Sequence, residues 1–139
     1  MMDATDKKLM EIATNATKKC AKVGSGVTGV VGCALMTDKG NIFEWVCLAF
    51  DCQLWFCAEH TAIAAMITNG ESKIMKIVAT MQNGTPIPPC WRCRELIFQT
   101  HKDNIDTEII ISEDKKTTLK ELLPNRWQDI YFGSWDKKI

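Results

Sequence analysis

Two short cysteine segments constrain this chain of 139 residues more than any other feature. In the first segment Glu59 follows Cys57 by two positions, and in the second Cys93 follows Cys90 by three positions. Three thiolates that converge on one divalent ion leave a fourth position open for water, and a nearby carboxylate can move a proton. The fold must therefore bring together two segments that are far apart in the sequence.

The length and charge of the chain limit what it can be. A chain of 139 residues is about one domain long, so we expect residues 1–139 to form a single domain. The 17 basic and 17 acidic side chains cancel, and no basic run is long enough to follow a phosphate backbone. This favours a small neutral or zwitterionic substrate over a nucleic-acid polymer. Residues 1–19 lack the continuous apolar stretch of a signal peptide or membrane span, so we expect no membrane association and a cytoplasmic location.

The chain has seven cysteines, an odd number that indicates metal binding and buried thiols more than a disulfide framework. Cys20 and Cys33 are predicted to be small core residues because their neighbours follow helical and strand patterns. Cys47 and Cys52 precede the first cysteine segment and are also expected to pack. Cys52 is kept as an alternative fourth metal ligand.

The hydrophobic pattern predicts helices and strands that alternate along the chain. Helices are predicted over residues 3–20, 57 or 58 to 69, 90–101 and 119–123, and strands over residues 30–37, 42–49, 73–81, 107–112 and 129–132. A tight hairpin turn is predicted at residues 38–40, and Gly70 is predicted to end the second helix. This order predicts an α/β fold, a three-layer α/β/α sandwich with a mixed sheet of about five strands.

Both cysteine segments are predicted to lie where a loop enters a helix. At such a position the unpaired backbone N–H groups and the positive end of the helix dipole stabilise a thiolate over a thiol. His60, Arg92 and Arg94 add positive charge nearby. This placement would let three thiolates share one divalent ion.

Two alternatives use the same cysteines without this chemistry. In a closed zinc site, Cys52 would complete four sulfurs, but Glu59 would then have no role. In a redox site, Cys90 and Cys93 would form a C-x-x-C pair, although a lone C-x-x-C is common and here follows a second helix. Both alternatives explain less of the sequence than an open zinc site.

Several further motifs occur in the same order as in a known family. Residues 32–43 match that family's first hairpin almost position by position, and residues 57–59, 89–94 and 122–124 match later motifs, with an aromatic following at Trp127. On these residues the chain, from about residue 32 to residue 127, resembles the small cytidine deaminase family. This family includes cytidine and deoxycytidine deaminases and blasticidin-S deaminases.

The resemblance implies a set of roles for the matched residues. Cys57, Cys90 and Cys93 would hold one Zn²⁺ per chain, and Glu59 would act as general base and then general acid. The zinc would lower the pKa of water to about 7, and hydroxide would attack the ring carbon that bears the exocyclic amine. Glu59 would then deliver protons to the ring nitrogen and the leaving amine. The backbone N–H of Ala58 would hold the ring carbonyl.

Other positions depart from the family pattern, and several of them are positions at which the family binds the sugar or the base of its substrate. Cys47 and Ala49 stand where the family has the Asn and Glu that bind the ribose hydroxyls, and neither can replace those hydrogen bonds. Gly26-Val27 and Gly29 stand where the family has a Tyr-Ser segment and an aromatic that packs on the pyrimidine. We therefore expect an altered sugar pocket and a nucleoside or nucleoside analogue as the substrate, including cytosines with substituted amines.

Charged and aromatic positions around the motifs also differ. His60 replaces an Arg that neutralises the zinc thiolates in tetrameric members, so His60 and Arg94 are candidates for this role. Trp91 replaces a small residue and is expected at the substrate entrance or at a subunit interface. Trp127 matches an aromatic that closes the pocket, often in a neighbouring subunit. This implies a homo-oligomer, a tetramer in preference to a dimer.

The aromatic residues just before Cys57 are unusually dense. We expect Trp45, Phe50, Trp55 and Phe56 to serve core and interface packing, with a stacking platform for a heterocycle as the alternative.

The sequence leaves three functional hypotheses. The leading hypothesis is a zinc-dependent hydrolytic deaminase of a cytosine nucleoside or analogue, including blasticidin-type antibiotics. The second is a zinc-binding module of the same fold without turnover. The third is a polynucleotide deaminase, which the balanced charge disfavours.

Overall fold

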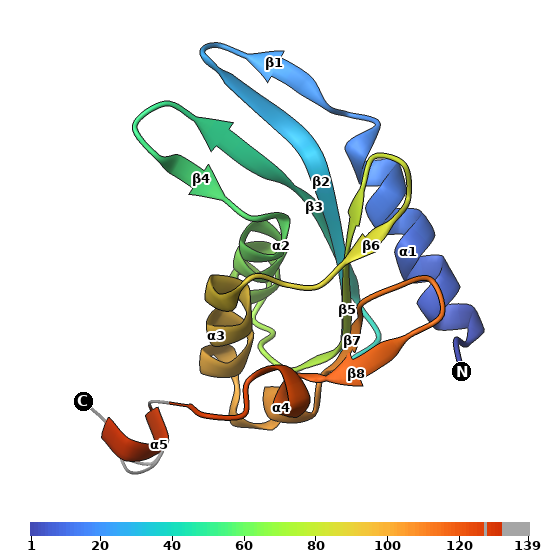
Figure 1. Cartoon of the computed structure of the whole chain (residues 1–139), viewed down its shortest axis with the longest axis vertical. Coiled ribbons are helices and arrows are strands. Elements are labelled where there is room, and N and C mark those ends of the chain that lie inside the picture. The colour runs from blue at the N-terminus through green and yellow to red at the C-terminus, as the bar shows by residue number, and fades with distance from the viewer. Residues whose placement is uncertain (127, 132–139) are drawn as a thin grey trace.

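The computed structural model describes residues 1–126 and 128–131, which form a mixed sheet with helices on both faces (Figure 1). The helices are α1 (Ala4–Thr17), α2 (Ala58–Thr68), α3 (Trp91–Thr100), α4 (Leu119–Leu122) and α5 (Gln128–Tyr131), with a 3-10 helix η1 (Lys102–Asp106). The strands are β1 (Ala21–Val23), β2 (Gly26–Thr37), β3 (Ile42–Phe50), β4 (Leu54–Phe56), β5 (Ile74–Met81), β6 (Pro86–Ile87), β7 (Glu108–Ile110) and β8 (Lys116–Thr118). None of the described helices is long and apolar enough to cross a membrane.

The predicted α/β/α sandwich with a mixed sheet is confirmed. The strand order is β4-β3-β2-β5-β7-β8, with β1 beside β2 and β6 beside β5. Only β5 and β7 pair in parallel, and the other paired strands of the described residues are antiparallel. Helix α1 covers one face of this sheet, and α2 and α3 cover the other (Figure 1).

The number of strands differs from the prediction. The described part of the chain contains an 8-stranded sheet instead of about five strands. Strands β1, β4, β6 and β8 have two or three residues each, which is too short for an alternating pattern to be recognised in the sequence.

The predicted strand over residues 129–132 is wrong, because α5 occupies residues 128–131 and Phe132 lies outside the described residues. Nε and Nη2 of Arg126 donate to Oδ2 of Asp129 at 2.9 and 2.8 Å, and a spacing of three positions suits a helical turn. The strand was predicted from the residue types at positions 129–132, and these do not show the ion pair between Arg126 and Asp129.

Both predicted turns are confirmed by their hydrogen bonds. At the β2–β3 hairpin, the N–H of Gly40 donates to the carbonyl of Thr37 at 3.0 Å. At the end of α2, the N–H of Gly70 donates to Ile67 at 2.9 Å. The φ angle of Gly70 is +76°, a left-handed conformation that favours glycine at the position after a helix.

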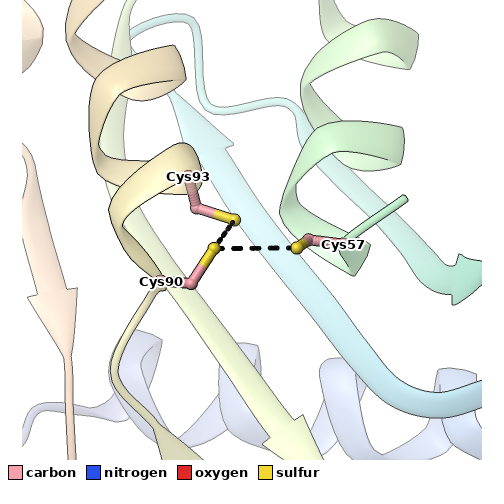
Figure 2. A group of neighbouring side chains, drawn as sticks. All are labelled: Cys57, Cys90 and Cys93. Atoms are coloured by element: carbon pink, nitrogen blue, oxygen red, sulfur yellow. Dashed lines mark hydrogen bonds between the residues drawn. The ribbon is translucent and has the colours of Figure 1, made fainter. Parts of the chain in front are cut away.

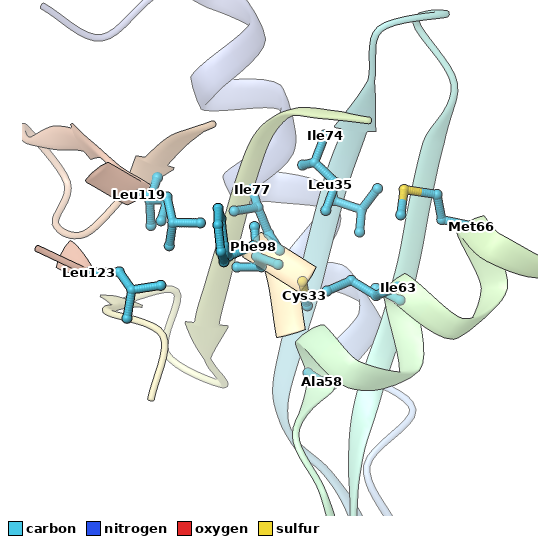
Figure 3. Packing of buried hydrophobic residues seen from close by; sticks show 13 residues of the cluster. Cys33, Leu35, Ala58, Ile63, Met66, Ile74, Ile77, Phe98, Leu119 and Leu123 are labelled. Atoms are coloured by element: carbon cyan, nitrogen blue, oxygen red, sulfur yellow. The ribbon is translucent and has the colours of Figure 1, made fainter. Parts of the chain in front are cut away.

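The two faces of β2 belong to two separate cores. Ala34 faces α1 and packs with Leu9 and Ala13, as the periodicity of the first helix predicts. Cys33 and Leu35 face the other way, into a larger core. This core also includes Ala62, Ile63 and Met66 of α2 and Ile97 and Phe98 of α3 (Figure 3). The prediction of a buried Cys33 is confirmed, whereas Cys20 lies in the connection between α1 and β1 and is only partly buried.

Candidate functional site

The topology delivers the two cysteine segments to the same face of the sheet. Strand β3 leads through β4 to Cys57, which is the N-cap of α2, and β5 leads through β6 to Cys90, which is the N-cap of α3. Cys93 lies in the first turn of α3. Because α2 and α3 both cover the face opposite α1, their first turns meet and the three cysteines converge (Figures 1 and 2).

The three sulfurs lie at distances that a tetrahedral zinc ion requires. Sγ of Cys90 is 3.7 Å from Sγ of Cys57 and 3.4 Å from Sγ of Cys93, and all three sulfurs lie within 4.8 Å of one another. Zn–S bonds of about 2.3 Å in tetrahedral geometry separate neighbouring sulfurs by about 3.8 Å. The sulfur triad therefore fits a Zn²⁺ ion.

The fourth position of this tetrahedron is open among the described residues. No other His, Cys, Asp or Glu of that part of the chain joins the sulfur triad. Cys52, the alternative fourth ligand, is exposed in the β3–β4 turn. Cys93 is buried, Cys57 is half-buried and Cys90 is exposed, so one side of the triad faces solvent. An open position and access to solvent favour a catalytic zinc site over a closed structural one.

The electrostatic surroundings favour a thiolate at Cys57. A hydrogen bond from Cys93 is the largest cause that lowers the pKa of Cys57 to about 5, and it outweighs the opposing effect of burial. A hydrogen bond from Cys90 and the charges of His60 and Arg92 lower the pKa further. The same hydrogen bond raises the pKa of Cys93. A thiolate is the form of cysteine that binds zinc.

Glu59 lies in the first turn of α2, and 5% of it is exposed. Burial is the largest cause that raises the pKa of Glu59, and the negative charge of Cys57 adds to it. The raised pKa makes the protonated form of this carboxyl easier to reach than in water, which suits a group that both accepts and releases a proton. Its place beside the sulfur triad matches the role predicted for a proton carrier.

Ala58 is the first residue of α2 and is fully buried in the larger core. The first N–H groups of an α-helix have no partner within the helix, and the N–H of Ala58 is one of them. The role predicted for this N–H is compatible with its position next to Cys57.

Arg94 has its donors committed to backbone carbonyls. Its Nε donates to Pro89 at 2.8 Å, its Nη1 donates to Leu122 at 3.1 Å, and its guanidinium lies 4.6 Å from the ring centroid of Trp91. These contacts join the loop before Cys90 to the end of α4. The arginine whose charge lowers the pKa of Cys57 is Arg92. The sequence placed both arginines near the cysteines but did not distinguish their directions.

His60 remains a candidate for thiolate neutralisation. Its backbone N–H donates to the carbonyl of Cys57 at 3.0 Å, and its charge lowers the pKa of the Cys57 thiol. Nε2 of His60 is buried without a hydrogen-bond partner. Most buried polar atoms have a hydrogen-bond partner, so the unsatisfied Nε2 of His60 is an exception among the described residues.

The residues predicted to bind substrate lie at different places. Sγ of Cys47 accepts a hydrogen bond from the N–H of Val31 at 3.3 Å, and Ala49 is a partly buried residue of β3. Trp91 is 65% exposed at the start of α3. Trp127 lies outside the described residues. None of the described ones belongs to the sulfur triad.

The aromatic cluster before Cys57 is mostly exposed. Trp45, Trp55 and Phe56 are 51%, 65% and 46% exposed, whereas Phe50 is partly buried. The core part of the packing prediction is therefore wrong for these three side chains, and the interface part stays a prediction. Their positions on β3 and at the sheet edge β4 leave them available to another surface.

A comparison with protein families finds one family that matches most of the chain. The family described as the cytidine and deoxycytidylate deaminase zinc-binding region matches residues 3–108. The matched residues include the whole sulfur triad and Glu59.

Individual relatives agree with this match. A blasticidin-S deaminase of Bacillus cereus is 28% identical over 127 residues, which cover 85% of this chain and 91% of that protein. A cytidine deaminase of Halalkalibacterium halodurans is 26% identical over 99 residues, covering 68% of this chain and 74% of that protein. The crystal structure of cytidine deaminase from Mycobacterium leprae covers 88% of this chain and 100% of its own, with a TM-score of 0.76 and 24% identity. This structural similarity shows that the fold is shared.

Proposed function

Because this chain belongs to the cytidine and deoxycytidylate deaminase zinc-binding family, we propose that it is a zinc-dependent hydrolytic deaminase of a cytosine nucleoside or nucleoside analogue. The observation that carries the proposal is the convergence of three sulfurs at zinc-like spacing beside the buried carboxyl of Glu59. A closed structural zinc site would not need this carboxyl, and it would not leave the fourth position open.

The residues of this chain have distinct parts in the reaction. Cys57, Cys90 and Cys93 would hold one Zn²⁺ per chain. When bound, Zn²⁺ supplies the acidification of water that makes hydroxide available near neutral pH. Glu59 accepts the proton that water loses and passes it to the ring nitrogen beside the amine-bearing carbon. The oxygen of the water adds to the amine-bearing carbon, and the hydroxyl proton of the resulting adduct passes through Glu59 to the amine. The C–N bond then breaks, ammonia leaves, and the added oxygen becomes the ring carbonyl.

The surroundings of Glu59 support both directions of proton transfer. Burial disfavours its charged form, so its pKa is raised and its protonated state is easier to reach than in water. The N–H of Ala58 would orient the ring carbonyl in the same helical turn. One turn of α2 therefore contributes a metal ligand, an orienting donor and a proton carrier.

The substrates that we propose are cytidine, deoxycytidine, blasticidin S and cytosine derivatives with a non-standard sugar. The names of the two curated relatives support the first and third of these classes. Cys47 and Ala49 carry no side-chain group that can replace a carboxylate or amide toward ribose hydroxyls. This supports a substrate whose sugar is recognised differently or is not recognised.

The decisive experiment measures zinc content per chain together with the ultraviolet change that accompanies deamination of each candidate substrate. One zinc per chain and turnover of at least one substrate, lost in Glu59→Gln with zinc retained, would support the proposal. Zinc binding without turnover of any substrate would instead favour a non-catalytic zinc module. Absence of zinc from the purified chain and from chain reconstituted with zinc would reject the proposed metal site.

We also propose that the protein is a homo-oligomer, a tetramer in preference to a dimer. The exposure of Trp45, Trp55 and Phe56 supports this, because large apolar side chains gathered near a sheet edge are typical of an interface. Sedimentation of the wild type and of Trp55→Glu tests it. We expect a multimer for the wild type and smaller species for the variant, and a monomeric wild type would reject it.

A further inference from the structure

Strand β2 contains an irregular segment where it pairs with β3. Its pairing with β3 is regular at Thr28 with Leu48 and again at Gly32 with Val46. Between these pairs β2 advances by four residues while β3 advances by two, so β2 carries two extra residues. We call residues 28–32 the β2 bulge. Bulges of this kind redirect a strand and occur often next to active sites.

The face of the β2 bulge toward α1 has no free space. A Cβ atom on Gly29, whose φ is +80°, would lie 2.8 Å from Cα of Cys20. A Cβ atom on Gly32 would lie 2.0 Å from the carbonyl oxygen of Ala13. The backbone of the bulge therefore rests on α1 at Gly32 and on the connection between α1 and β1 at Gly29, and it cannot move in that direction.

The opposite face of the β2 bulge is held by a side chain. The N–H of Val31 donates to Sγ of Cys47 at 3.3 Å, where a regular ladder would offer a backbone carbonyl. Sulfur is a weak acceptor, but it satisfies a backbone donor that the extra residues have moved out of register. Val31 and Cys47 both pack against the larger core, which includes Ala58.

The β2 bulge also lies between the two strands that lead to the metal ligands. On one side Val31 pairs with Met81 of β5, the strand that continues through β6 to Cys90. On the other side it contacts Cys47 of β3, the strand that continues through β4 to Cys57.

The neighbouring residue of β3 connects the same region to α2. Oγ1 of Thr61 donates to the carbonyl of Val46 at 2.9 Å. It also lies 2.9 Å from the carbonyl of Ala58, in the turn that carries Glu59. The β2 bulge is therefore connected through β3 to the start of α2.

We propose that Cys47 is a positioning residue that acts through the β2 bulge: its sulfur holds Val31 and so sets the shape of the part of the sheet on which α2 and its site residues rest, without contacting the substrate. The proposal rests on the proposed deaminase function for the nature of the substrate. The sulfur faces the Val31 N–H, and this contact gives position 47 a role that does not require sugar recognition.

Hydrogen exchange of the Val31 amide tests the contact directly in the zinc-loaded full chain. In Cys47→Ala we expect this amide to exchange about tenfold faster, because it loses its acceptor. Cys47→Ser keeps an acceptor and should restore most of the protection. Cys52→Ala is a matched control, since Cys52 is exposed in the β3–β4 turn, and it should leave the Val31 amide unchanged. Unchanged exchange in Cys47→Ala would overturn the proposal.

Steady-state kinetics test the consequence for substrate. We expect Cys47→Ala to raise KM about threefold to tenfold with kcat within about twofold, because a shift of the bulge alters the sheet on which α2 rests while the cysteines and Glu59 stay at the starts of α2 and α3. Cys47→Ser should recover the KM of the wild type. A raised KM without faster Val31 exchange would mean direct substrate contact, and faster exchange without a change in KM would mean a purely structural contact; either result would overturn the proposal.

Failure of the proposed function would be recognised separately. If the wild type turned over none of the candidate substrates, the deaminase proposal would fail, while equilibrium dialysis with cytidine and blasticidin S would replace KM. Binding weakened in Cys47→Ala and restored in Cys47→Ser, together with the exchange result, would still support the positioning role. Binding equal in all variants, or absent from the wild type, would overturn it.

Discussion

The two faces of the sheet hold charged groups in opposite ways. Under α1, a buried carboxylate is surrounded by lysines that the chain itself supplies. Under α2 and α3, three thiols and a carboxyl converge, and Glu59 takes part in no ion pair of the described residues. The first arrangement pairs its buried carboxylate with cations of the chain, and the second would gain its cation by binding a metal. Whether a buried carboxyl has a cation of the chain beside it therefore distinguishes a structural ion cluster from a functional site, and the number of charged residues does not.

The charged groups under α1 join this helix to strands β5, β7 and β8. Asp6 is fully buried, and its carboxylate lies 2.7 Å from Nζ of Lys76 and 3.0 Å from Nζ of Lys116. Glu108 lies 3.2 and 3.0 Å from the same two lysines, and Asp3 lies 2.5 Å from Lys76. We call these five residues the α1 ion cluster.

The pKa of Asp6 depends on two opposing effects, burial and hydrogen bonding. Burial alone would raise it, but hydrogen bonds from Lys76, from the backbone N–H of Asp3 and from Lys116 outweigh burial and lower the pKa of Asp6. Under α2 the balance has the opposite sign, because burial and the Cys57 charge raise the pKa of Glu59. Glu59 has no ion-pair partner among the described residues and a raised pKa, which suits proton transfer, whereas Asp6 lies between two lysines that lower its pKa.

The largest expected effect separates the two carboxyls by activity. Glu59→Gln should lower kcat about 10⁴-fold, because the amide cannot carry a proton. Asp6→Asn is the matched change in the α1 ion cluster and should leave kcat within about threefold at a temperature where the variant is folded. Steady-state kinetics of both variants check this. Equal losses of kcat would contradict the distinction between the two faces.

Removal of zinc should affect one face only. At free zinc about a thousandfold above its Kd, bound metal adds about 4 kcal/mol to the free energy of unfolding. A chelator should remove this contribution in the wild type and in Asp6→Asn alike, as measured by urea unfolding with and without metal. A loss confined to the wild type would show that the α1 ion cluster also depends on the metal.

Breaking the α1 ion cluster should cost stability and spare metal binding. Asp6→Asn leaves two lysines without their buried partner and should lower the free energy of unfolding by about 3 kcal/mol. Zinc content per chain should stay at that of the wild type, measured by elemental analysis of the folded protein. A loss of zinc with little loss of stability would reverse the roles assigned to the two faces.

The smallest effect is a dependence of stability on acid pH. Because the pKa of Asp6 is lowered on folding, its contribution is fully present above the usual Asp pKa of about 3.9 and is lost as the pH falls through the folded value. Urea unfolding between about pH 2 and pH 5 should show a steeper decrease for the wild type than for Asp6→Asn. Parallel curves would mean that Asp6 does not titrate as the α1 ion cluster requires.

Much of the fold could be predicted because periodicity reports burial. The first helix was predicted from apolar residues such as Leu9 and Ala13, and both are fully buried. The cysteine segments could be predicted as a site because their spacing allows one ion to be shared once two helix starts meet. Strand β4 and the helix at residues 128–131 could not be predicted, because such short elements are decided by their neighbours rather than by their own pattern.

The chemistry of the site was determined by residue types and spacing alone: three thiols that can hold zinc, and Glu59 two positions after Cys57. Only the tertiary structure decided which groups surround them. It directed Arg94 to backbone carbonyls, gave Cys47 to the Val31 amide, and placed Asp6 between two lysines. The reason is physical: bonding capacity belongs to a side chain, whereas a direction, a partner and a pKa depend on what the rest of the chain packs around it.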